Sequence, residues 1–401
     1  MAVVLIGTLD TKGTEFRFVR DLLHQQGLAT LVIDASVLGS PTFAPDVPRD
    51  ELYAAAGTSL ETVQRERDRG RAIDAAARGA AKVVTDLWQQ RKVDGILGLG
   101  GSAGTTIGTA AMRAVPFGVP KLMVSTLASG QVQHYVGVRD ILMMPSVVDI
   151  SGLNRVSRTV LTNAALAMGG MVRKPAERPD VSADKPLITA TMFGVTTPCV
   201  EAARKQLEAK DYEVLVFHAT GTGGRTMESF ITDGLIAGVL DITTTELADE
   251  LVGGVLSAGP DRLTAAALRG IPQVISLGAL DMVNFGPPET VPEKLRSRRF
   301  YQHNPTVTLM RTTPDENDRL GKEIAHKASA ARSPTAVLVP LRGVSAIDIE
   351  GGPFWWPEAD QALFQSLRNW MSPEVQLVEL DLHINDPQFA QAAVDMLLRQ
   401  L

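Results

Sequence analysis

Residues Gly95–Thr106 read GILGLGGSAGTT and predict a strand, a glycine-rich turn and the first turn of a helix. Apolar residues precede the glycines, and small residues with helical spacing follow them as far as Met112. A helix that starts this way leaves backbone N–H groups unpaired, and its dipole favours an anion there. Glycines could also serve only a tight turn and close packing. Because several glycines stand among hydroxyl side chains, we favour anion binding, with these candidates: Gly100, Gly101, Ser102, Gly104 and Thr105.

The type of anion follows from what the stretch lacks. It has no Lys-Ser/Thr ending, so it is not a P-loop. Gly98, Gly100 and Ala103 fit the looser dinucleotide pattern, but no acidic residue follows about 20 positions later, as that pattern requires. The next strand ends instead at Ser125 and Thr126. NAD is therefore disfavoured, and a mononucleotide or a small phosphorylated or carboxylated metabolite is expected.

Composition excludes several classes of function. The 401 residues are 45% hydrophobic and carry a net charge of −6 without a basic run, which argues against nucleic acid as a partner. The single cysteine, Cys199, excludes an intramolecular disulfide and predicts a cytoplasmic protein. Residues 1–7 lack the features of a signal peptide, and no stretch predicts a membrane span. No histidine–carboxylate spacing indicates a metal site.

The first half begins with a βαβ pattern. Residues 2–7 predict a buried strand, Thr14 a helix N-cap, and residues 28–33 a second strand that ends at Asp34. Polar residues gather after these strands, where parallel sheets bind ligands. The candidates are Asp10 (a ribose hydroxyl, or Mg²⁺ through water), Thr11, Lys12 (a phosphate), Asp34 (a ribose), and Thr126 and Ser129 in a second hydroxyl-rich turn. The alternatives are turn or cap aspartates and a solvated lysine.

Two halves with related order are expected. Residues 173–186 carry charge and prolines without apolar periodicity and predict a linker between subdomains 1–172 and 187–401. In the second half, 238–246 stands in the place of the glycine-rich loop, and 304–313 corresponds to 140–146. We therefore expect an α/β protein with two Rossmann-like subdomains, mainly parallel sheets and a weak internal repeat, facing each other across a cleft.

Polar residues near the C-terminus predict a second wall of that cleft. Arg342 follows a predicted strand and has the planar geometry that binds a carboxylate or phosphate. Asp348 lies in the same loop, and His383 follows the last strand beside Asn385 and Asp386. An acid–base role for His383 is one interpretation, and a structural histidine is the other.

Four motifs together resemble those of one known family. Gly7–Lys12, Gly98–Thr105, Val339–Gly343 and His383–Asp386 are similar, in this order, to segments of the ATP-binding domain family named for the tomato mosaic virus resistance protein. The resemblance covers essentially the whole chain. It implies two Rossmann-like subdomains, ATP bound mainly by the first, with or without Mg²⁺, and a homo-oligomer such as a dimer. The plant relative inhibits viral replication, so the resemblance does not imply an enzyme.

Two functions from different classes follow. The first is an ATP-binding enzyme that acts on a small anionic metabolite in the cleft, with Arg342, Asp348 and His383 as its catalytic residues. The second is a non-catalytic binding or inhibitory protein that depends on a nucleotide.

Overall fold

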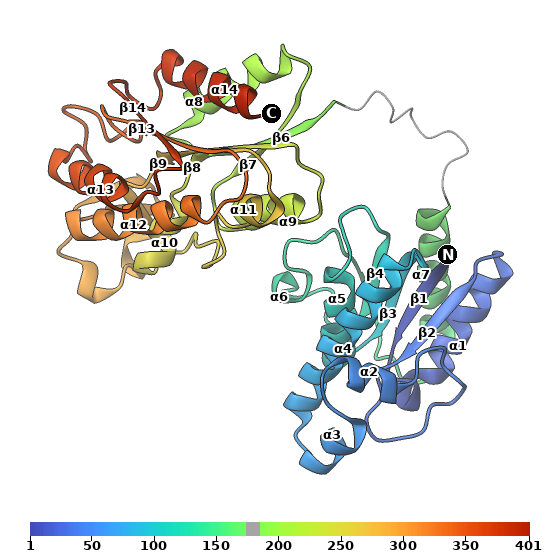
Figure 1. Cartoon of the computed structure of the whole chain (residues 1–401). Helices are drawn as coiled ribbons and strands as arrows, with labels where there is room; N and C mark the ends of the chain where they lie inside the picture. Colours follow the sequence, from blue (N-terminus) through green and yellow to red (C-terminus); the bar gives the residue numbers. More distant parts are fainter. Residues whose placement is uncertain (174–184) are drawn as a thin grey trace. The chain divides into compact units, whose positions relative to one another are not determined.

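The computed structural model describes residues 1–173 and 185–401. The chain divides into two compact units, Met1–Pro179 and Asp180–Leu401, called here the N-terminal and C-terminal units (Figure 1). Except for its ends, the predicted linker 173–186 lies outside the described residues. No helix among the described residues has the length and apolar character of a membrane span.

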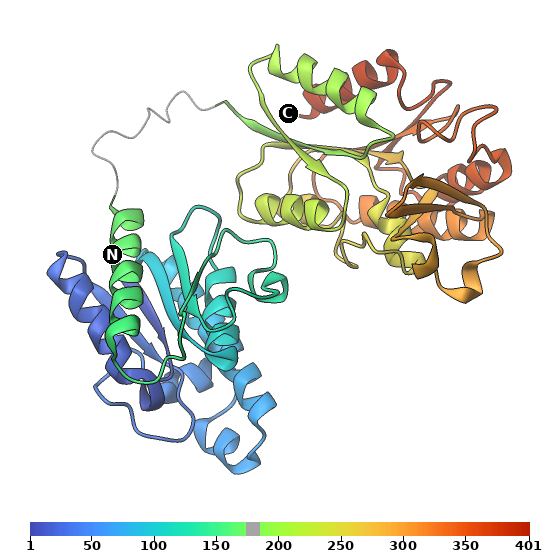
Figure 2. The ribbon, with the colours of Figure 1, turned by 180° about the vertical axis from the view of Figure 1, so that it is seen from behind.

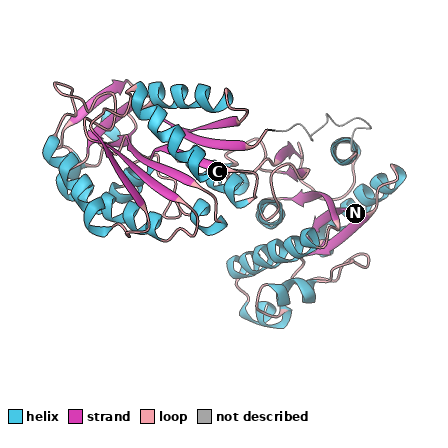
Figure 3. Ribbon diagram, turned by 45° about the horizontal axis from the view of Figure 1, so that its top comes forward, coloured by secondary structure: helices cyan, strands magenta, loops and turns pink. Residues whose placement is uncertain are grey.

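The N-terminal unit is built on a parallel five-stranded sheet with the order β2-β1-β3-β4-β5. Apolar residues run on along the central strands instead of alternating, because helices cover both faces of the sheet (Figure 3). The strands are β1 (Ala2–Gly7), β2 (Thr30–Asp34), β3 (Val93–Gly100), β4 (Lys121–Ser125) and β5 (Leu142–Pro145).

Seven helices among the described residues accompany this sheet. Two hydrophobic clusters separate the faces: one joins the sheet to α4 and α5, and the other joins it to α1 and α7 (Figure 2). The helices are α1 (Leu9–Gln25), α2 (Arg49–Ala55), α3 (Leu60–Glu66), α4 (Arg69–Gln89), α5 (Ser102–Arg113), α6 (Gln133–Val136) and α7 (Arg155–Val172).

The strand order places a topological switch point between β1 and β3. The connection from β1 leads to β2 on one side, and the connection from β3 leads to β4 on the other. Helices α1 and α5 therefore leave the same edge of the sheet in neighbouring positions but cover opposite faces. Ligands bind at such a point in open parallel sheets.

The C-terminal unit has a parallel six-stranded sheet with the order β14-β13-β9-β8-β6-β7 and a smaller antiparallel sheet with the order β10-β12-β11. The parallel strands are β6 (Leu187–Met192), β7 (Glu213–His218), β8 (Gly238–Thr243), β9 (Gln273–Gly278), β13 (Thr335–Pro340) and β14 (Gln376–Leu380). The antiparallel strands are β10 (Met282–Phe285), β11 (Phe300–Asn304) and β12 (Val307–Arg311).

Helices again cover both faces of the parallel sheet. One hydrophobic cluster contains α8 and α14, and another contains α10, α12 and α13. The helices are α8 (Thr197–Glu208), α9 (Thr222–Thr232), α10 (Glu246–Val252), α11 (Ala265–Arg269), α12 (Pro314–Ser329), α13 (Pro357–Trp370) and α14 (Pro387–Gln400). Two 3₁₀ helices, η2 (Pro288–Thr290) and η3 (Glu293–Leu295), lie between β10 and β11.

The internal repeat is present in the topology, with one correction. In chain order, the first five parallel strands of each unit are arranged 2-1-3-4-5. The fifth strand of the C-terminal unit is β13 and not the predicted 304–313, because β12 pairs antiparallel with β10 and β11 in the smaller sheet. The predicted correspondence was wrong because the segment inserted between β9 and β13 forms the smaller antiparallel sheet.

The first helix also begins earlier than predicted. Helix α1 starts at Leu9, not after Thr14, and Thr8 occupies its N-cap position. Buried Leu9 and Gly13 both face the interior in this first turn, and Gly13 packs against the side chain of Thr42. Asp10, Thr11 and Lys12 consequently project from a helix N-terminus instead of a loop.

Glycines of the β3–α5 turn serve two different purposes. A Cβ added at Gly100 would lie 2.7 Å from the Cα of Gly104, so α5 approaches β3 too closely for any side chain there. A Cβ at Gly98 would meet the sulfur of Met123 at 2.7 Å. At Gly101, by contrast, the nearest atom to an added Cβ is Thr126 Oγ1 at 3.6 Å, an ordinary contact. Packing therefore requires Gly100, where backbone atoms oppose an added Cβ, but not Gly101.

This difference predicts opposite outcomes for two neighbouring substitutions. Gly100→Ala should destabilise the N-terminal unit by about 1–3 kcal/mol through overpacking, whereas Gly101→Ala should leave its stability nearly unchanged. Hydrogen exchange of β3 and β4 amides in the full-length protein measures the effect in this unit alone. Equal protection in the two variants would contradict the packing argument.

Candidate functional site

A cavity of about 910 Å³ lies at the carboxyl edge of the N-terminal sheet, at the β1/β3 switch point. The ends of β1 and β3, the starts of α1 and α5, and the region from α3 to α4 contribute its walls. Of the predicted ligand-binding residues, those that line it are Asp10, Thr11, Lys12, Gly100, Gly101, Ser102 and Gly104. Residues from five separate stretches of the sequence thus meet around one space, since the loop after β2 and Asp149 also line it.

The N-terminus of α5 presents free hydrogen-bond donors to this cavity. The first backbone bond of the helix runs from the N–H of Thr105 to the carbonyl of Gly101, at 2.8 Å. The N–H groups of Ser102, Ala103 and Gly104 have no partner among the described residues. Because Gly101 has no side chain and space lies above it, a ligand oxygen can approach these groups.

Lys12 and Asp10 add a cation and a carboxylate beside these donors. The ammonium of Lys12 donates to the carbonyl of Ile150 and keeps two further donor positions. Asp10 accepts from the N–H of Gly39 through Oδ2, at 3.1 Å, whereas its buried Oδ1 has no partner. The acidic side chain of Asp149 also lines the cavity, although sequence analysis did not single it out.

Asp34 does not face the cavity, contrary to its predicted contact with a ribose. The residue is fully buried, and its Oδ1 accepts from the N–H groups of Leu9 (3.1 Å) and Ser36 (3.0 Å) and from the Ser36 hydroxyl. The carboxylate therefore satisfies the start of α1 and holds the loop after β2. The position at a strand end was predicted correctly, but the side chain turns inward to cap a helix.

Three other predicted residues also lie outside the cavity lining. Thr105 is fully buried, and its hydroxyl is hydrogen-bonded to that of Ser125 at 2.7 Å. Thr126 lies next to Gly101 and donates its N–H to the carbonyl of Gly100, so it shapes the turn from behind. Ser129 is exposed in the loop before α6. Hydroxyl spacing in the sequence did not reveal which side chains face inward.

The α3–α4 region lines the cavity with aliphatic side chains, with Gln64 and Asp68, and with two arginines that sequence analysis missed. Arg67 and Arg69 lie on either side of the α3–α4 junction and have no hydrogen-bond or ion-pair partner among the described residues. The charge-rich run from Arg65 to Arg71 indicated an exposed segment, but it did not indicate which of its side chains line the cavity. The apolar wall consists of Ala35, Val37, Leu38, Val63, Ala72, Ile73, Ala76 and Ile107.

The three predicted catalytic residues lie in the C-terminal unit and do not converge on a common space there. Arg342 is exposed and forms a two-point ion pair with Asp381, with distances of 2.7 Å. Both ring nitrogens of His383 are engaged: Nε2 donates to the carbonyl of Ser345 (2.9 Å), and Nδ1 accepts from the N–H of Asn385 (3.1 Å). His383 therefore anchors the loop after β13 to the loop after β14.

Asp348 anchors the same loop from inside. The residue is fully buried, and its Oδ2 accepts from the N–H of Val344 at 2.9 Å. Gly343 has a φ of 124°, and a Cβ there would lie 1.8 Å from the carbonyl oxygen of Asp348, so the loop is tightly folded on itself. The carboxyl edge of the C-terminal sheet is thus covered by its own chain. The N–H of Ala279 donates a hydrogen bond to the carbonyl of Val344, and the N–H of Ala346 donates one to the carbonyl of Val195.

Three buried carboxyl groups surround one buried guanidinium in this region. Arg311 lies 2.6 Å from Asp360 and 3.5 Å from Asp348. Burial and the negative charge of Asp281 raise the pKa of Asp348 to about 7, and burial and the charge of Asp348 raise the pKa of Asp360 to about 7. Burial also raises the pKa of Asp281 to about 6, against the opposing effect of Arg311. One cation does not compensate three carboxylates.

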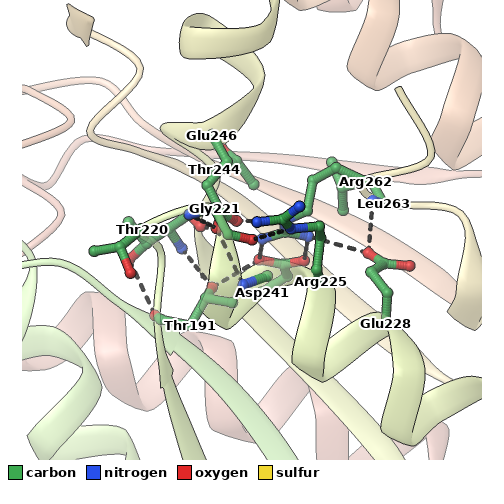
Figure 4. A network of polar contacts seen from close by, with 12 residues as sticks. Thr191, Thr220, Gly221, Arg225, Glu228, Asp241, Thr244, Glu246, Arg262 and Leu263 are labelled. Atoms are coloured by element: carbon green, nitrogen blue, oxygen red, sulfur yellow. Dashed lines mark hydrogen bonds and ion pairs between the residues drawn. The ribbon is translucent and has the colours of Figure 1, made fainter. Parts of the chain in front are cut away.

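A second buried network lies at the start of α9 in the same unit. Arg262 is fully buried and contacts Asp241 (2.5 Å), Glu246 (2.7 Å) and Glu228 (3.3 Å), as Figure 4 shows. Glu246 in turn accepts from the N–H groups of Gly221 (2.7 Å) and Gly224 (3.0 Å) at the start of α9. An internal carboxylate therefore occupies the anion position of that helix N-terminus.

The raised pKa values predict a pH-dependent stability for the C-terminal unit. For Asp348, the stabilisation by the protonated form is fully present below the unfolded value of 3.8 and is lost as the pH rises through about 7. Each unit of raised pKa corresponds to about 1.4 kcal/mol. Asp348→Asn should therefore reduce the difference in urea midpoint between pH 5 and pH 8, with hydrogen exchange of β13 peptides assigning the transition. An undiminished difference would contradict the prediction.

His383 and Arg342 should differ sharply in their structural roles. His383→Ala removes two hydrogen bonds that pin buried loops and should destabilise the C-terminal unit by about 1–3 kcal/mol. Arg342→Ala removes only a solvated ion pair and should leave the unfolding midpoint unchanged. Thermal unfolding of both variants, with the N-terminal unit as internal reference, provides the measurement. An unchanged stability of the His383→Ala protein would contradict this structural role and would favour an acid–base role for His383.

Comparisons with known proteins place the chain in a family. The sequence profile described as the N-terminal domain of an uncharacterised protein family, UPF0261, matches residues 1–177, and that of the C-terminal domain of the same family matches residues 185–401. A UPF0261 protein of Clostridium tetani is 52% identical over 400 residues, covering 100% of this chain and 98% of that protein. A UPF0261 protein of Rhizobium meliloti is 49% identical, covering 98% of this chain and 97% of that protein.

A plant protein and one solved structure complete the comparison. The ToMV resistance protein Tm-1(GCR237) of Solanum lycopersicum is 41% identical over 416 residues, which cover 99% of this chain and 55% of that protein. The crystal structure of a putative UDP-N-acetylglucosamine 2-epimerase from Listeria monocytogenes aligns with a TM-score of 0.23 and 11% identity over 69% of this chain and 79% of that chain. The chain therefore belongs to the UPF0261 family and contains both of its domains.

Proposed function

We propose that the N-terminal unit binds a nucleotide, with ATP as the first ligand to test, in the cavity at the β1/β3 switch point. The observation that carries this proposal is the pairing of free N–H groups at the start of α5 with an aliphatic wall across the same cavity. Phosphate oxygens would lie on Ser102, Ala103 and Gly104, and the base would lie against the aliphatic wall. The volume of about 910 Å³ is within the range of cofactor-sized pockets.

Charges around the cavity fit a phosphorylated ligand that carries a divalent cation. Lys12 would contact a phosphate oxygen. Asp10 and Asp149 would hold Mg²⁺ directly or through water, because this ion takes one or two carboxylates together with substrate phosphates. The unpaired buried Oδ1 of Asp10 is the oxygen for which such a partner is missing.

The contacts of the three predicted catalytic residues in the C-terminal unit favour a binding function over catalysis on an anionic metabolite. Arg342, Asp348 and His383 were predicted as catalytic residues, yet His383 and Asp348 are committed to loop anchoring and Arg342 to Asp381. We therefore propose a nucleotide-dependent binding protein, with the enzyme that acts on a small anionic metabolite as the alternative. A homo-oligomer and a cytoplasmic location remain predictions.

Gly101 supplies the sharpest test of the nucleotide site. Gly101→Val would place two methyl groups over the free N–H groups and should lower the affinity for ATP with Mg²⁺ by at least about tenfold, since phosphate contacts of this kind are charge-assisted. Titration calorimetry on the full-length protein measures the affinity. Unchanged affinity in this variant would remove the α5 turn from the site.

The matched control is Arg342→Ala, which changes a charged residue in the other unit. This variant should bind ATP as the wild type does. A parallel loss of affinity in Arg342→Ala and Gly101→Val would show that the effect is not specific to the cavity.

A further inference from the structure

A neutral amide side chain lies in the aliphatic part of the N-terminal cavity. Gln64, on α3, lines the cavity next to Val63 and is hydrogen-bonded to the backbone of Val37, which also lines it. We infer that Gln64 reads the base of the nucleotide, and that its carbonyl oxygen selects a base with an exocyclic amino group, as adenine and cytosine have. This inference rests on the proposed nucleotide site and specifies which bases it accepts.

The contact with Val37 fixes the orientation of the Gln64 amide. Its Nε2 donates to the carbonyl of Val37. A backbone carbonyl only accepts hydrogen bonds, so the amide nitrogen, and not the amide oxygen, has to face Val37. The oxygen Oε1 lies at the other end of the amide and has no hydrogen-bond partner among the described residues. Gln64 therefore brings to the cavity lining an acceptor that the described part of the chain does not use.

The loop that holds Gln64 is itself held against α1. A Cβ added at Gly39 would lie 2.9 Å from the Cβ of Asp10, so the loop after β2 lies directly on the start of the helix. Gly39 also donates its N–H to Oδ2 of Asp10 at 3.1 Å, and its carbonyl accepts from Arg49. These contacts restrict the backbone two residues after Val37. Because the amide of Gln64 is fixed in this way, little side-chain entropy is lost when Oε1 binds a ligand.

The other polar side chains that the α3–α4 region adds to the lining are charged. They are Arg67, Asp68 and Arg69, and all three are exposed. The carboxylate of Asp68 accepts from the N–H of Arg71 at 3.0 Å as the cap of α4. The two arginines only donate, so they would favour an oxygen at the edge of the base, where Gln64 favours an amino group. The base preference therefore distinguishes reading by Gln64 from reading by the arginines.

Bases differ in the exocyclic group that can meet this acceptor. Adenine carries the amino group N6 and cytosine carries N4, and both groups are donors. Guanine, hypoxanthine and uracil carry an oxygen acceptor at the corresponding position. An amino group donates to Oε1 of Gln64, whereas an oxygen leaves two acceptors facing each other on a half-buried side chain. A few polar groups placed in this way give an otherwise apolar pocket its specificity.

ATP and inosine triphosphate (ITP) provide a matched pair, because they differ in whether position 6 of the purine carries an amino group or an oxygen. We expect the full-length protein with Mg²⁺ to bind ATP at least about tenfold more tightly than ITP in titration calorimetry. CTP and UTP repeat the comparison on a smaller ring, and CTP should bind more tightly. Equal affinity within either pair, or a preference for the nucleotide with the oxygen, would overturn the inference and leave the proposed function standing. No binding of any nucleotide would overturn both.

Gln64→Leu tests the residue itself, because leucine has nearly the size of glutamine but no amide. The ratio of ATP affinity to ITP affinity should fall to less than about threefold in this variant, mainly through weaker ATP binding. A purely structural role of Gln64 would instead weaken both nucleotides equally and keep the ratio.

The control Gln89→Leu removes an exposed glutamine of α4 that does not line the cavity. This variant should keep the wild-type ratio. If Gln64→Leu keeps the ratio, or if Gln89→Leu loses it as well, the inference is wrong.

Discussion

The close approach of α5 to β3 is the constraint on which the candidate site depends. Gly100 and Gly104 touch through their backbones, and Gly98 and Gly108 both lie against Met123, so the helix lies directly on the strand. This contact fixes where α5 begins and aims its first N–H groups past the edge of the sheet. Only Gly101, which packing does not need, leaves the approach to those groups open. Gly100 thus serves the packing of α5 on β3, whereas the adjacent Gly101 leaves space for a ligand.

The two units share one strand order, but the carboxyl edge of the sheet is open to a cavity in the first unit and covered by a loop in the second. In the N-terminal unit, the α3–α4 region stands away from the edge and leaves a cavity of about 910 Å³. In the C-terminal unit, the loop after β13 folds over the edge and is held there by Asp348 and His383. Buried charges also differ: Glu246 accepts a hydrogen bond at the start of α9 and is paired with the buried Arg262. The repeated architecture therefore does not imply two ligand sites.

Three buried carboxyl groups with raised pKa values predict a pH-dependent stability for the C-terminal unit. Asp281, Asp348 and Asp360 lie around the single cation Arg311, and burial raises the pKa of each carboxyl group. Such a cluster is a cost to stability near neutral pH, because several charges are removed from water together. The hydrogen bonds from Ser345 and Val344 show what the cluster supports, namely the loop that covers the sheet edge.

The sequence by itself determined the fold class, the strand–helix–strand order at the start of the first unit and the position of the glycine-rich strand–helix turn at Gly95–Thr106. These follow from local patterns: apolar runs make buried parallel strands, and a glycine cluster between strand and helix frees N–H groups. Only the tertiary structure decided which side chains face the cavity. Asp34 ends a strand as predicted but turns inward to cap α1, while Arg67, distant in sequence, reaches the cavity wall. The direction in which a side chain points depends on contacts between segments that are far apart in the chain, and no local sequence pattern encodes these contacts.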